Sequence, residues 1–299
     1  MNTLIAKLGA TGDVVRTTPI LRRLSGQVTW LTAGKNSALI EGLSKNVRCI
    51  LWDERHLIPD IEFDLIISLE DTLEIASFLQ GIKCKQRFGA YVGINDTLCY
   101  TDDSREWFDM SLISRFGRKE ADRRKLLNRR TYQELIFEGL GWRFGGEKYL
   151  LPEPIEAEVA GDVAISMECG PVWPMKHWAY YNELKSELES RGFTVNVLGK
   201  RGSLLEHLSD VSNHRCLVGG DSLPMHLALG TGTRCVSIFN CTSPWEIYDY
   251  GLQQKIISPL LEQFFYQRTC DARATTAVSV ENVLNAVLSQ LEVPASVGK

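Results

Sequence analysis

The chain has 299 residues, about twice the length of a typical domain, and 44% of them are hydrophobic, which is enough to form two separate cores. Its formal net charge is −4, so it lacks the excess of positive charge with which proteins neutralise nucleic-acid phosphates. The composition predicts a two-domain protein with no nucleic-acid partner.

The first apolar segment, residues 3–8, is too short for a signal sequence or a membrane span, and Lys7 lies within it. We therefore expect a cytoplasmic protein. The eight cysteines are scattered, and none forms a CxxC pair. Reduced thiols and no metal site are expected.

In the first half, apolar runs alternate with amphipathic runs, which is typical of the α/β class, a parallel sheet covered by helices. Residues 95–130 are polar and charge-dense, and we interpret them as an insertion outside the core. A helix is expected over 131–140. The expected strands are 3–8, 28–32, 47–52 and 63–68, and helices are expected to begin near Asp13, Lys35 and Asp71.

The segment from Arg115 to Arg130 is strongly cationic. It could bind an anionic acceptor or contact the inner surface of the plasma membrane, since each lysine or arginine near anionic lipid adds about 1 kcal/mol. Alternatively, it is a solvated insertion that pairs with its own acids, Glu120 and Asp122.

Pro152 and Pro154, flanked by glutamates, indicate a linker, so we expect domains at 1–155 and 156–299. The second half repeats the α/β rhythm and predicts a second doubly wound domain. The expected strands are 163–167, 193–198, 215–218, 234–239 and 255–258, with helices at 178–191, near Ser203, at 223–229 and at 280–291.

A glycine-containing turn joins the first predicted strand to the first predicted helix. Residues 8–15 read LGATGDVV, with Gly12 directly before Asp13. Glycines let the backbone turn tightly and let a ligand approach closely, and open α/β sheets bind ligands beyond the carboxyl ends of their strands. Asp13 is therefore a candidate functional carboxylate, unless it only caps its helix.

The same turn, Gly-Ala-Thr-Gly, also opens the dinucleotide site of many short-chain dehydrogenases. That fingerprint needs a third glycine where this chain has Val15, and a side chain there would crowd the pyrophosphate. A Tyr181-x-x-x-Lys185 pair is present, but its helix has the charges of a solvated face. An NADP-dependent dehydrogenase remains a minor alternative.

Residues 169–178 (CGPVWPMKHW) lead from a predicted strand into a helix. Lys176 would lie at the carboxyl end of the strand, where its point charge suits a diphosphate. A solvated loop lysine is the alternative, although Trp173 and Trp178 on either side indicate an ordered loop.

Residues 219–228 (GGDSLPMHLA) again carry a strand through glycines into a helix. The helix start favours an anion, and Ser222 could add a hydroxyl donor. Asp221 could hold a ribose or sugar hydroxyl or cap the helix. His226 lies one turn after Ser222 and could face the same ligand, or it could be a half-buried helix histidine.

Together, residues 12–19 (GDVVRTTP), 176–178 (KHW) and 221–228 (DSLPMHLA) resemble the pattern of family 9 glycosyltransferases. The heptosyltransferases of lipopolysaccharide core biosynthesis are that family's best-known members. The resemblance implies a GT-B fold, in which two Rossmann-like domains face a central cleft. It also implies that the chain is an enzyme, a glycosyltransferase that inverts the anomeric carbon without a metal or a cofactor.

The resemblance assigns substrates to the domains and roles to residues. The N-terminal domain would bind an acceptor glycan or glycolipid, and the C-terminal domain, with its closing helix, an ADP-activated heptose or related sugar. Asp13 matches the catalytic base, and Lys176 matches the residue that stabilises charge on the departing ADP. The residues expected to line the donor site are Gly12, Trp178, Gly220, Asp221, Ser222 and His226.

The chain departs from the family at Leu223, where a glycine is usual. Without that glycine the backbone approaches a ligand less closely, so the donor's pose and identity stay open. A sugar-nucleotide epimerase or hydrolase of the same fold would share the cleft without an acceptor pocket. A non-enzymatic binding or assembly subunit is a further alternative.

Overall fold

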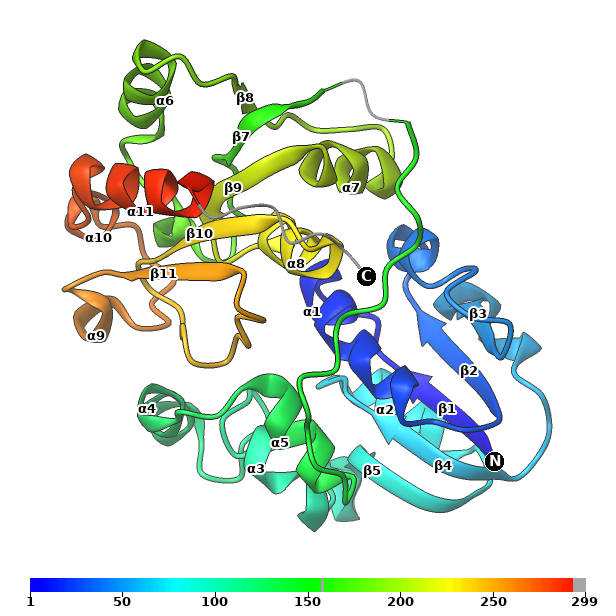
Figure 1. The fold of residues 1–299 in the computed structure, drawn as a ribbon. Helices are drawn as coiled ribbons and strands as arrows, with labels where there is room; N and C mark the ends of the chain where they lie inside the picture. The colour runs from blue at the N-terminus through cyan, green and yellow to red at the C-terminus, as the bar shows by residue number, and fades with distance from the viewer. Residues whose placement is uncertain (157–158, 293–299) are drawn as a thin grey trace. The chain divides into compact units, whose positions relative to one another are not determined.

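The structure is a computed structural model that describes residues 1–156 and 159–292. The chain divides into two compact units, Met1–Pro152 and Glu153–Lys299. Each unit is built on its own, mainly parallel sheet with helices on both faces (Figure 1). The predicted α/β class with two Rossmann-like halves is confirmed.

The first unit has a six-stranded sheet in the order β3-β2-β1-β4-β5-β6, in which β5 and β6 pair antiparallel and the other pairs are parallel. The order 3-2-1-4-5 is that of the Rossmann fold. The strands are β1 (Asn2–Ala6), β2 (Gln27–Thr32), β3 (Val47–Leu51), β4 (Phe63–Ser68), β5 (Cys84–Val92) and β6 (Leu98–Tyr100). The α-helices are α1 (Thr11–Thr17), α2 (Leu73–Gln80), α3 (Arg105–Phe108), α4 (Arg118–Leu127) and α5 (Tyr132–Gly139).

Side-chain alternation along the central strands fills both faces of this sheet. Ile5 packs with the apolar side chains of α1 and α5 on one face, whereas Leu4 packs with those of α2 on the other. Helix α5 begins with a capping box between Thr131 and Glu134, the pattern that favours a helix start. The helix expected near Lys35 is a 3-10 helix, Gly34–Leu39.

Two sequence predictions for the first unit are wrong. Strand β5 was not expected because Lys85, Gln86 and Arg87 interrupt its apolar pattern. Residues 95–130 are not an insertion outside the core, since Phe108 and Ala121 are fully or almost fully buried. The many charged residues of this segment obscure its few apolar side chains in the sequence, and those side chains are buried in the structure.

The second unit has a five-stranded parallel sheet in the order β11-β10-β9-β7-β8. Counted within the unit, this is the 2-1-3-4-5 order of flavodoxin-like folds. The strands are β7 (Gly161–Ser166), β8 (Val195–Val197), β9 (His214–Gly220), β10 (Arg234–Phe239) and β11 (Gln253–Ile257). The α-helices are α6 (Tyr181–Ser190), α7 (Leu204–Ser212), α8 (Leu223–Thr231), α9 (Leu261–Phe264), α10 (Ala272–Thr276) and α11 (Val280–Glu292).

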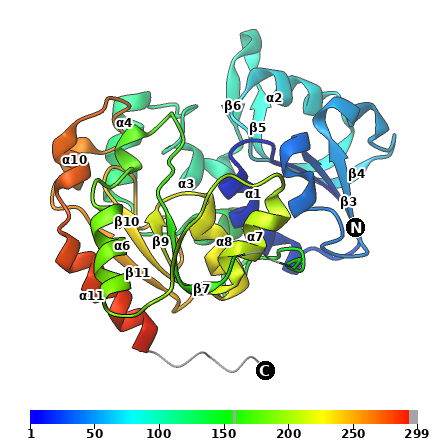
Figure 2. The ribbon, with the colours of Figure 1, turned by 90° about the horizontal axis from the view of Figure 1, so that it is seen from above.

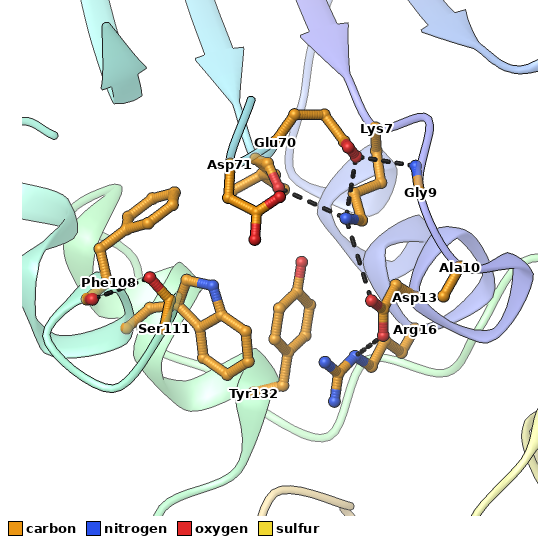
Figure 3. A pocket seen from close by; sticks show the side chains of 12 residues that line it. Lys7, Gly9, Ala10, Asp13, Arg16, Glu70, Asp71, Phe108, Ser111 and Tyr132 are labelled. Carbon is orange, nitrogen blue, oxygen red and sulfur yellow. Dashed lines mark hydrogen bonds and ion pairs between the residues drawn. The ribbon is translucent and has the colours of Figure 1, made fainter. Parts of the chain in front are cut away.

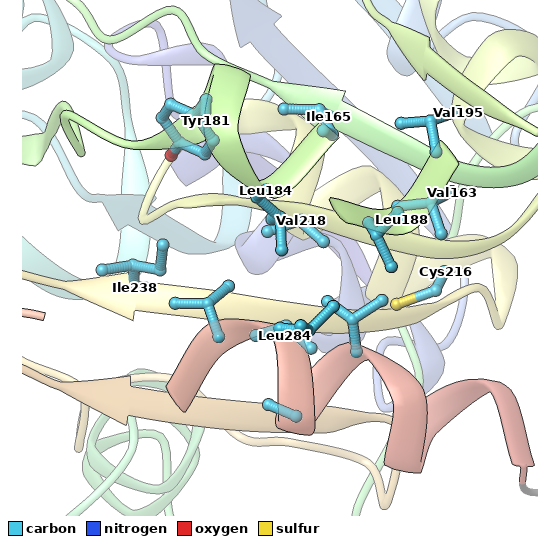
Figure 4. Close-up of a cluster of buried hydrophobic side chains, with 14 of the residues drawn as sticks. Val163, Ile165, Tyr181, Leu184, Leu188, Val195, Cys216, Val218, Ile238 and Leu284 are labelled. Carbon is cyan, nitrogen blue, oxygen red and sulfur yellow. The ribbon is translucent and has the colours of Figure 1, made fainter. Parts of the chain in front are cut away.

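Helices α6 and α11 cover one face of this sheet, and α7 and α8 cover the other (Figure 1 and Figure 2). Figure 4 shows the core beneath α6 and α11, where Leu184 and Leu284 meet Val218 of the central strand. These strands are buried on both faces, which explains their nearly continuous apolar sequences.

One glycine of β5 lets this strand lie close to β4. Gly89 of β5 has φ +100°, and a Cβ there would lie 2.0 Å from the Ser68 carbonyl oxygen of β4. We expect Gly89→Ala to lower the thermal unfolding temperature more than Gly42→Ala does, because Gly42 has a positive φ but open space around it. The control should cost about 1–2 kcal/mol, the penalty for the left-handed backbone alone. Equal losses, measured by calorimetry, would contradict a clash at Gly89.

Candidate active site

Strand order places the first group of functional residues. In the first unit the chain runs outward through β2 and β3 on one side of β1 and through β4, β5 and β6 on the other. The order therefore reverses between β1 and β4, which is where open α/β sheets bind ligands, beyond the carboxyl ends of the strands. The segments after β1 and β4 meet there, at Lys7 and Glu70.

One carboxylate oxygen, Oε1 of Glu70, joins the segments that follow β1 and β4. Glu70 Oε1 accepts hydrogen bonds from the Lys7 ammonium at 2.9 Å, from the Leu8 backbone N–H at 2.7 Å and from the Gly9 backbone N–H at 2.9 Å. A Cβ at Gly9 would lie 3.2 Å from Glu70 Oε2. Glycine at position 9 thus lets the turn close over the carboxylate.

Asp13 is the third residue of α1, and the residue that precedes this helix is Ala10, without a side-chain cap. Asp13 is therefore not the N-cap, and the capping alternative is wrong. Its carboxylate lies between two cations, with Arg16 Nε at 2.9 Å and Lys7 Nζ at 3.9 Å. One third of the side chain is exposed, so this paired carboxylate remains open to a ligand.

The wall opposite is aromatic and comes partly from the segment that was misread as an insertion. The Arg16 guanidinium lies 4.3 Å from the ring centre of Tyr132 and 5.3 Å from that of Trp107. The Tyr132 hydroxyl shares a hydrogen bond with Thr17 Oγ1 at 2.8 Å, and burial raises the pKa of Tyr132. Tyr132 is thus a neutral wall of the pocket.

These groups enclose a cavity of about 170 Å³ within the first unit (Figure 3). One water needs only about 10–15 Å³, so the cavity has room for a polar group of a substrate. Gly12 of α1 is half-buried and is not among the lining residues. The lining residues are Lys7, Gly9, Ala10, Asp13, Arg16, Leu69, Glu70, Asp71, Trp107, Phe108, Ser111 and Tyr132.

The second unit repeats this arrangement at its own sheet. Its strand order reverses between β7 and β9, and the segments that follow them meet at Lys176 and Asp221. Lys176 Nζ lies 2.9 Å from Asp221 Oδ2 and donates to the Asp221 carbonyl oxygen at 2.6 Å. Both side chains are more than four-fifths buried.

Two predicted donor-site residues, Gly220 and Trp178, lie next to the loop that carries Lys176. A Cβ at Gly220 would lie 2.8 Å from the Lys176 carbonyl oxygen, so glycine at position 220 lets the Lys176 loop pack on β9. Trp178 is fully buried in the core, and its indole N–H donates to the Val278 carbonyl oxygen at 2.9 Å. The structure thus places both residues where they position the loop.

The start of α8 lies next to this pair. Ser222 precedes the helix without a side-chain cap, and its hydroxyl donates to the Gly220 carbonyl oxygen at 3.4 Å. Leu223 is the first helical residue. His226 is 4% exposed and is one of the groups that lower the pKa of Asp221. The histidine is therefore buried, not half-buried.

Sequence reasoning did not select several of these residues. The available signals were that Glu70 comes two residues after the apolar strand 63–68 and that Lys7 is the only charged residue of the apolar segment 3–8. In the second unit, Thr242 helps to lower the pKa of Asp221, and Asn240 Nδ2 donates to the His177 carbonyl oxygen at 3.0 Å. Both follow β10, the strand beside β9.

Three arginines of the cationic segment pair with acids of the same segment. Arg118 binds Asp122 at 2.7 Å, while Arg123 and Arg124 bind Glu120 at 2.7 and 2.9 Å. The hydrogen bond from Arg123, helped by Arg124, lowers the pKa of Glu120 to about 2. Self-pairing through these two acids, one of the two interpretations of the sequence, is present in the structure.

Within 1–156 and 159–292, no group of three or more histidine, cysteine, aspartate or glutamate side chains is arranged to hold a metal ion. The same residues include no helix long and apolar enough to cross a membrane.

The ion pair in the second unit makes stability depend on pH. Burial disfavours the Asp221 carboxylate, but the charges of Lys176 and His226 outweigh burial and lower its pKa to about 2. A carboxyl group with a lowered folded-state pKa stabilises the protein above pH about 4, and this stabilisation is lost as the pH falls toward 2. We expect Asp221→Asn to cost on the order of 2 kcal/mol near neutral pH and less at pH 3. Urea unfolding of both proteins from pH 6 to 2.5 measures this, and a constant difference would contradict it.

The comparisons with known proteins bear on both units. Residues 172–273 match the model of glycosyltransferase family 9 (heptosyltransferase), a segment that contains Lys176, Asp221 and His226. Among curated proteins, no sequence matches this chain.

Several solved structures share the fold over almost the whole chain. E. coli heptosyltransferase WaaC with ADP is 16% identical, has a TM-score of 0.62, and the match covers 97% of this chain and 100% of that one. A family 9 glycosyl transferase from Veillonella parvula is 14% identical, with a TM-score of 0.64 and 97% of each chain covered. The iron-containing dodecameric glycosyltransferase TibC from enterotoxigenic E. coli is 12% identical, with a TM-score of 0.59 and coverage of 97% and 75%.

These identities are low, so the structural matches establish the fold. The chain has the fold of heptosyltransferases over nearly its whole length and the sequence pattern of family 9 over residues 172–273, which confirms the resemblance predicted from its motifs.

Proposed function

We propose that this chain is a glycosyltransferase that moves a heptose, or a related sugar, from an ADP-activated donor to a hydroxyl of an acceptor glycan or glycolipid. The observation that carries the proposal is the Lys176–Asp221 pair at the start of α8, within the segment that matches the family model. Solved structures of the same fold include WaaC with ADP and WaaC with ADP-2-deoxy-2-fluoro heptose.

The second unit is the proposed donor-binding domain. Two of the three N–H groups of Lys176 point to Asp221, which leaves the third N–H and part of the positive charge for a diphosphate. The start of α8 adds the positive end of the helix dipole. Ser222 at the helix start could add a hydroxyl donor, and His226 is one of the groups that lower the pKa of Asp221.

The first unit is the proposed acceptor-binding domain, with Asp13 as the catalytic base. Asp13 would take the proton of the acceptor hydroxyl while the acceptor oxygen forms a bond to the anomeric carbon. The bond from that carbon to the phosphate oxygen breaks, and its electron pair leaves with ADP. A single displacement of this kind inverts the anomeric carbon and needs no covalent nucleophile.

We also propose that the transfer needs no metal. The developing negative charge lies on the ADP phosphates, and Lys176 together with the α8 start supplies fixed positive charge at that point. Full activity after extensive dialysis against EDTA is the expected result. A rate restored only by an added divalent ion would count against the proposal.

Contact with the inner membrane surface remains a proposal for the cationic segment. The internal pairs of Arg118, Arg123 and Arg124 reduce the charge available for lipid, whereas Lys119 on the same helix is exposed. A glycolipid acceptor would bring the protein to that surface.

The first test of the function is calorimetric titration of the protein with ADP, UDP, GDP and NADP, followed by mass analysis of the products formed from ADP-heptose. We expect selective ADP binding that Lys176→Met weakens roughly tenfold or more, because a charge-assisted contact is worth about 1.5–3 kcal/mol. Lys185→Met is the matched control, since Lys185 pairs with Glu189 on the exposed side of α6. Preference for UDP or GDP would change the donor, and tight NADP binding would favour the dehydrogenase alternative.

Asp13→Asn tests the base. The amide keeps the shape of the side chain but does not accept the proton, so turnover should fall about 10²- to 10⁴-fold with ADP affinity nearly unchanged. Steady-state kinetics and calorimetry on the same preparation measure the two effects. A large loss of ADP affinity with turnover intact would remove Asp13 from the role of base.

A further inference from the structure

The pocket of the first unit contains one ammonium group that two carboxylates share. Lys7 Nζ lies 2.9 Å from Glu70 Oε1 and 3.9 Å from Asp13 Oδ2 (Figure 3). Only the shorter distance is that of a hydrogen bond. Lys7 therefore donates a hydrogen bond to Glu70, whereas its interaction with Asp13 is only electrostatic.

Glu70 holds the ammonium because it is itself fixed. Its Oε1 atom accepts from the Leu8 and Gly9 backbone N–H groups as well as from Lys7, and its side chain is 7% exposed. Asp13 is one third exposed. The fixed Glu70 carboxylate therefore binds the Lys7 ammonium, and the more exposed Asp13 carboxylate remains available to a substrate.

We propose that Glu70 is a positioning residue, which holds the Lys7 ammonium off Asp13 and so keeps Asp13 basic enough to take the acceptor's proton. This inference rests on the proposed role of Asp13 as the base. Glu70 acts only through Lys7 and makes no contact of its own with the reacting atoms.

Removal of the Glu70 charge would leave Asp13 as the nearest acid to a buried ammonium. Burial lowers the pKa of Lys7, while its attraction to Glu70 and then to Asp13 raises it. Once Glu70 is neutral, the buried ammonium depends on the Asp13 carboxylate, 3.9 Å away, and would close on it. A closer cation favours the ionised carboxylate and makes it a weaker base. Weaker bases take protons more slowly.

Other charged or titratable groups also face this site. Arg16 pairs with Asp13 from the same helix, Asp71 lines the pocket from the segment after β4, and Tyr132 contributes from α5. They are unchanged in the variants below, so each variant isolates the effect of the Lys7–Glu70 pair.

The experiment measures the pH profile of kcat/KM in Glu70→Gln, in Lys7→Met and in the double variant. Glutamine keeps an oxygen that accepts from Leu8 and Gly9, so the turn is preserved while the charge is lost. We expect Glu70→Gln to lower the plateau roughly tenfold and to move the acidic limb about one pH unit lower. In the Lys7→Met background the same change should leave the limb nearly in place, because Glu70 acts through Lys7.

Asp64→Asn is the matched control. Asp64 pairs with Lys85 at 2.7 Å between β4 and β5, outside the pocket lining, so the limb should not move. A plateau that falls without a shift of the limb would show that Glu70 is merely structural. An equal shift with and without Lys7 would show that Glu70 acts on Asp13 directly, and either result overturns the inference.

A second readout does not require turnover. NMR of protein with isotopically labelled aspartate follows the Asp13 carboxylate, identified by the signal lost in Asp13→Asn, as pH is changed. The Asp13 signal should titrate at lower pH in Glu70→Gln. If it does so in a protein that transfers no sugar, the proposed function fails and the coupling stands. If sugar is transferred but the signal does not move, Glu70 has no positioning role.

Discussion

The constraint on which both candidate sites depend is that parallel strands bring their carboxyl ends to one edge of a sheet. Where strand order reverses, between β1 and β4 and between β7 and β9, the following loops have space between them. Residues 60 or more positions apart, such as Lys7 and Glu70, become ion-pair partners there. The Lys176–Asp221 pair has the same origin in the second sheet.

Each site contains a buried ion pair, and in the first site the more exposed Asp13 lies beside it. A buried pair is costly to form and costly to break at one partner, so it fixes geometry more than it adds stability. Glu70 fixes Lys7 beside Asp13, and Asp221 fixes Lys176 beside the start of α8. Glycines 9 and 220 make both arrangements possible, because a Cβ would collide or crowd at each.

The aromatic wall of the first pocket comes from a segment whose high charge predicted that it would lie outside the core. Residues 95–130 contain so many arginines and lysines that a solvated insertion was the natural interpretation. In the structure Phe108 anchors the segment in the core, and Trp107 lies against Arg16 in the pocket. Burial there depends on a few aromatic side chains, which hydrophobic periodicity does not detect in a charged background.

The sequence by itself determined the α/β class, most strands and the strand-to-helix connections near Asp13, Lys176 and Asp221, because apolar runs and glycine turns are local signals. Strands β4 and β10 were predicted residue for residue. Tertiary structure alone decided that Glu70 meets Lys7 and that Trp178 is buried. These outcomes depend on which strands become neighbours, and strand order is a long-range property that no local pattern encodes.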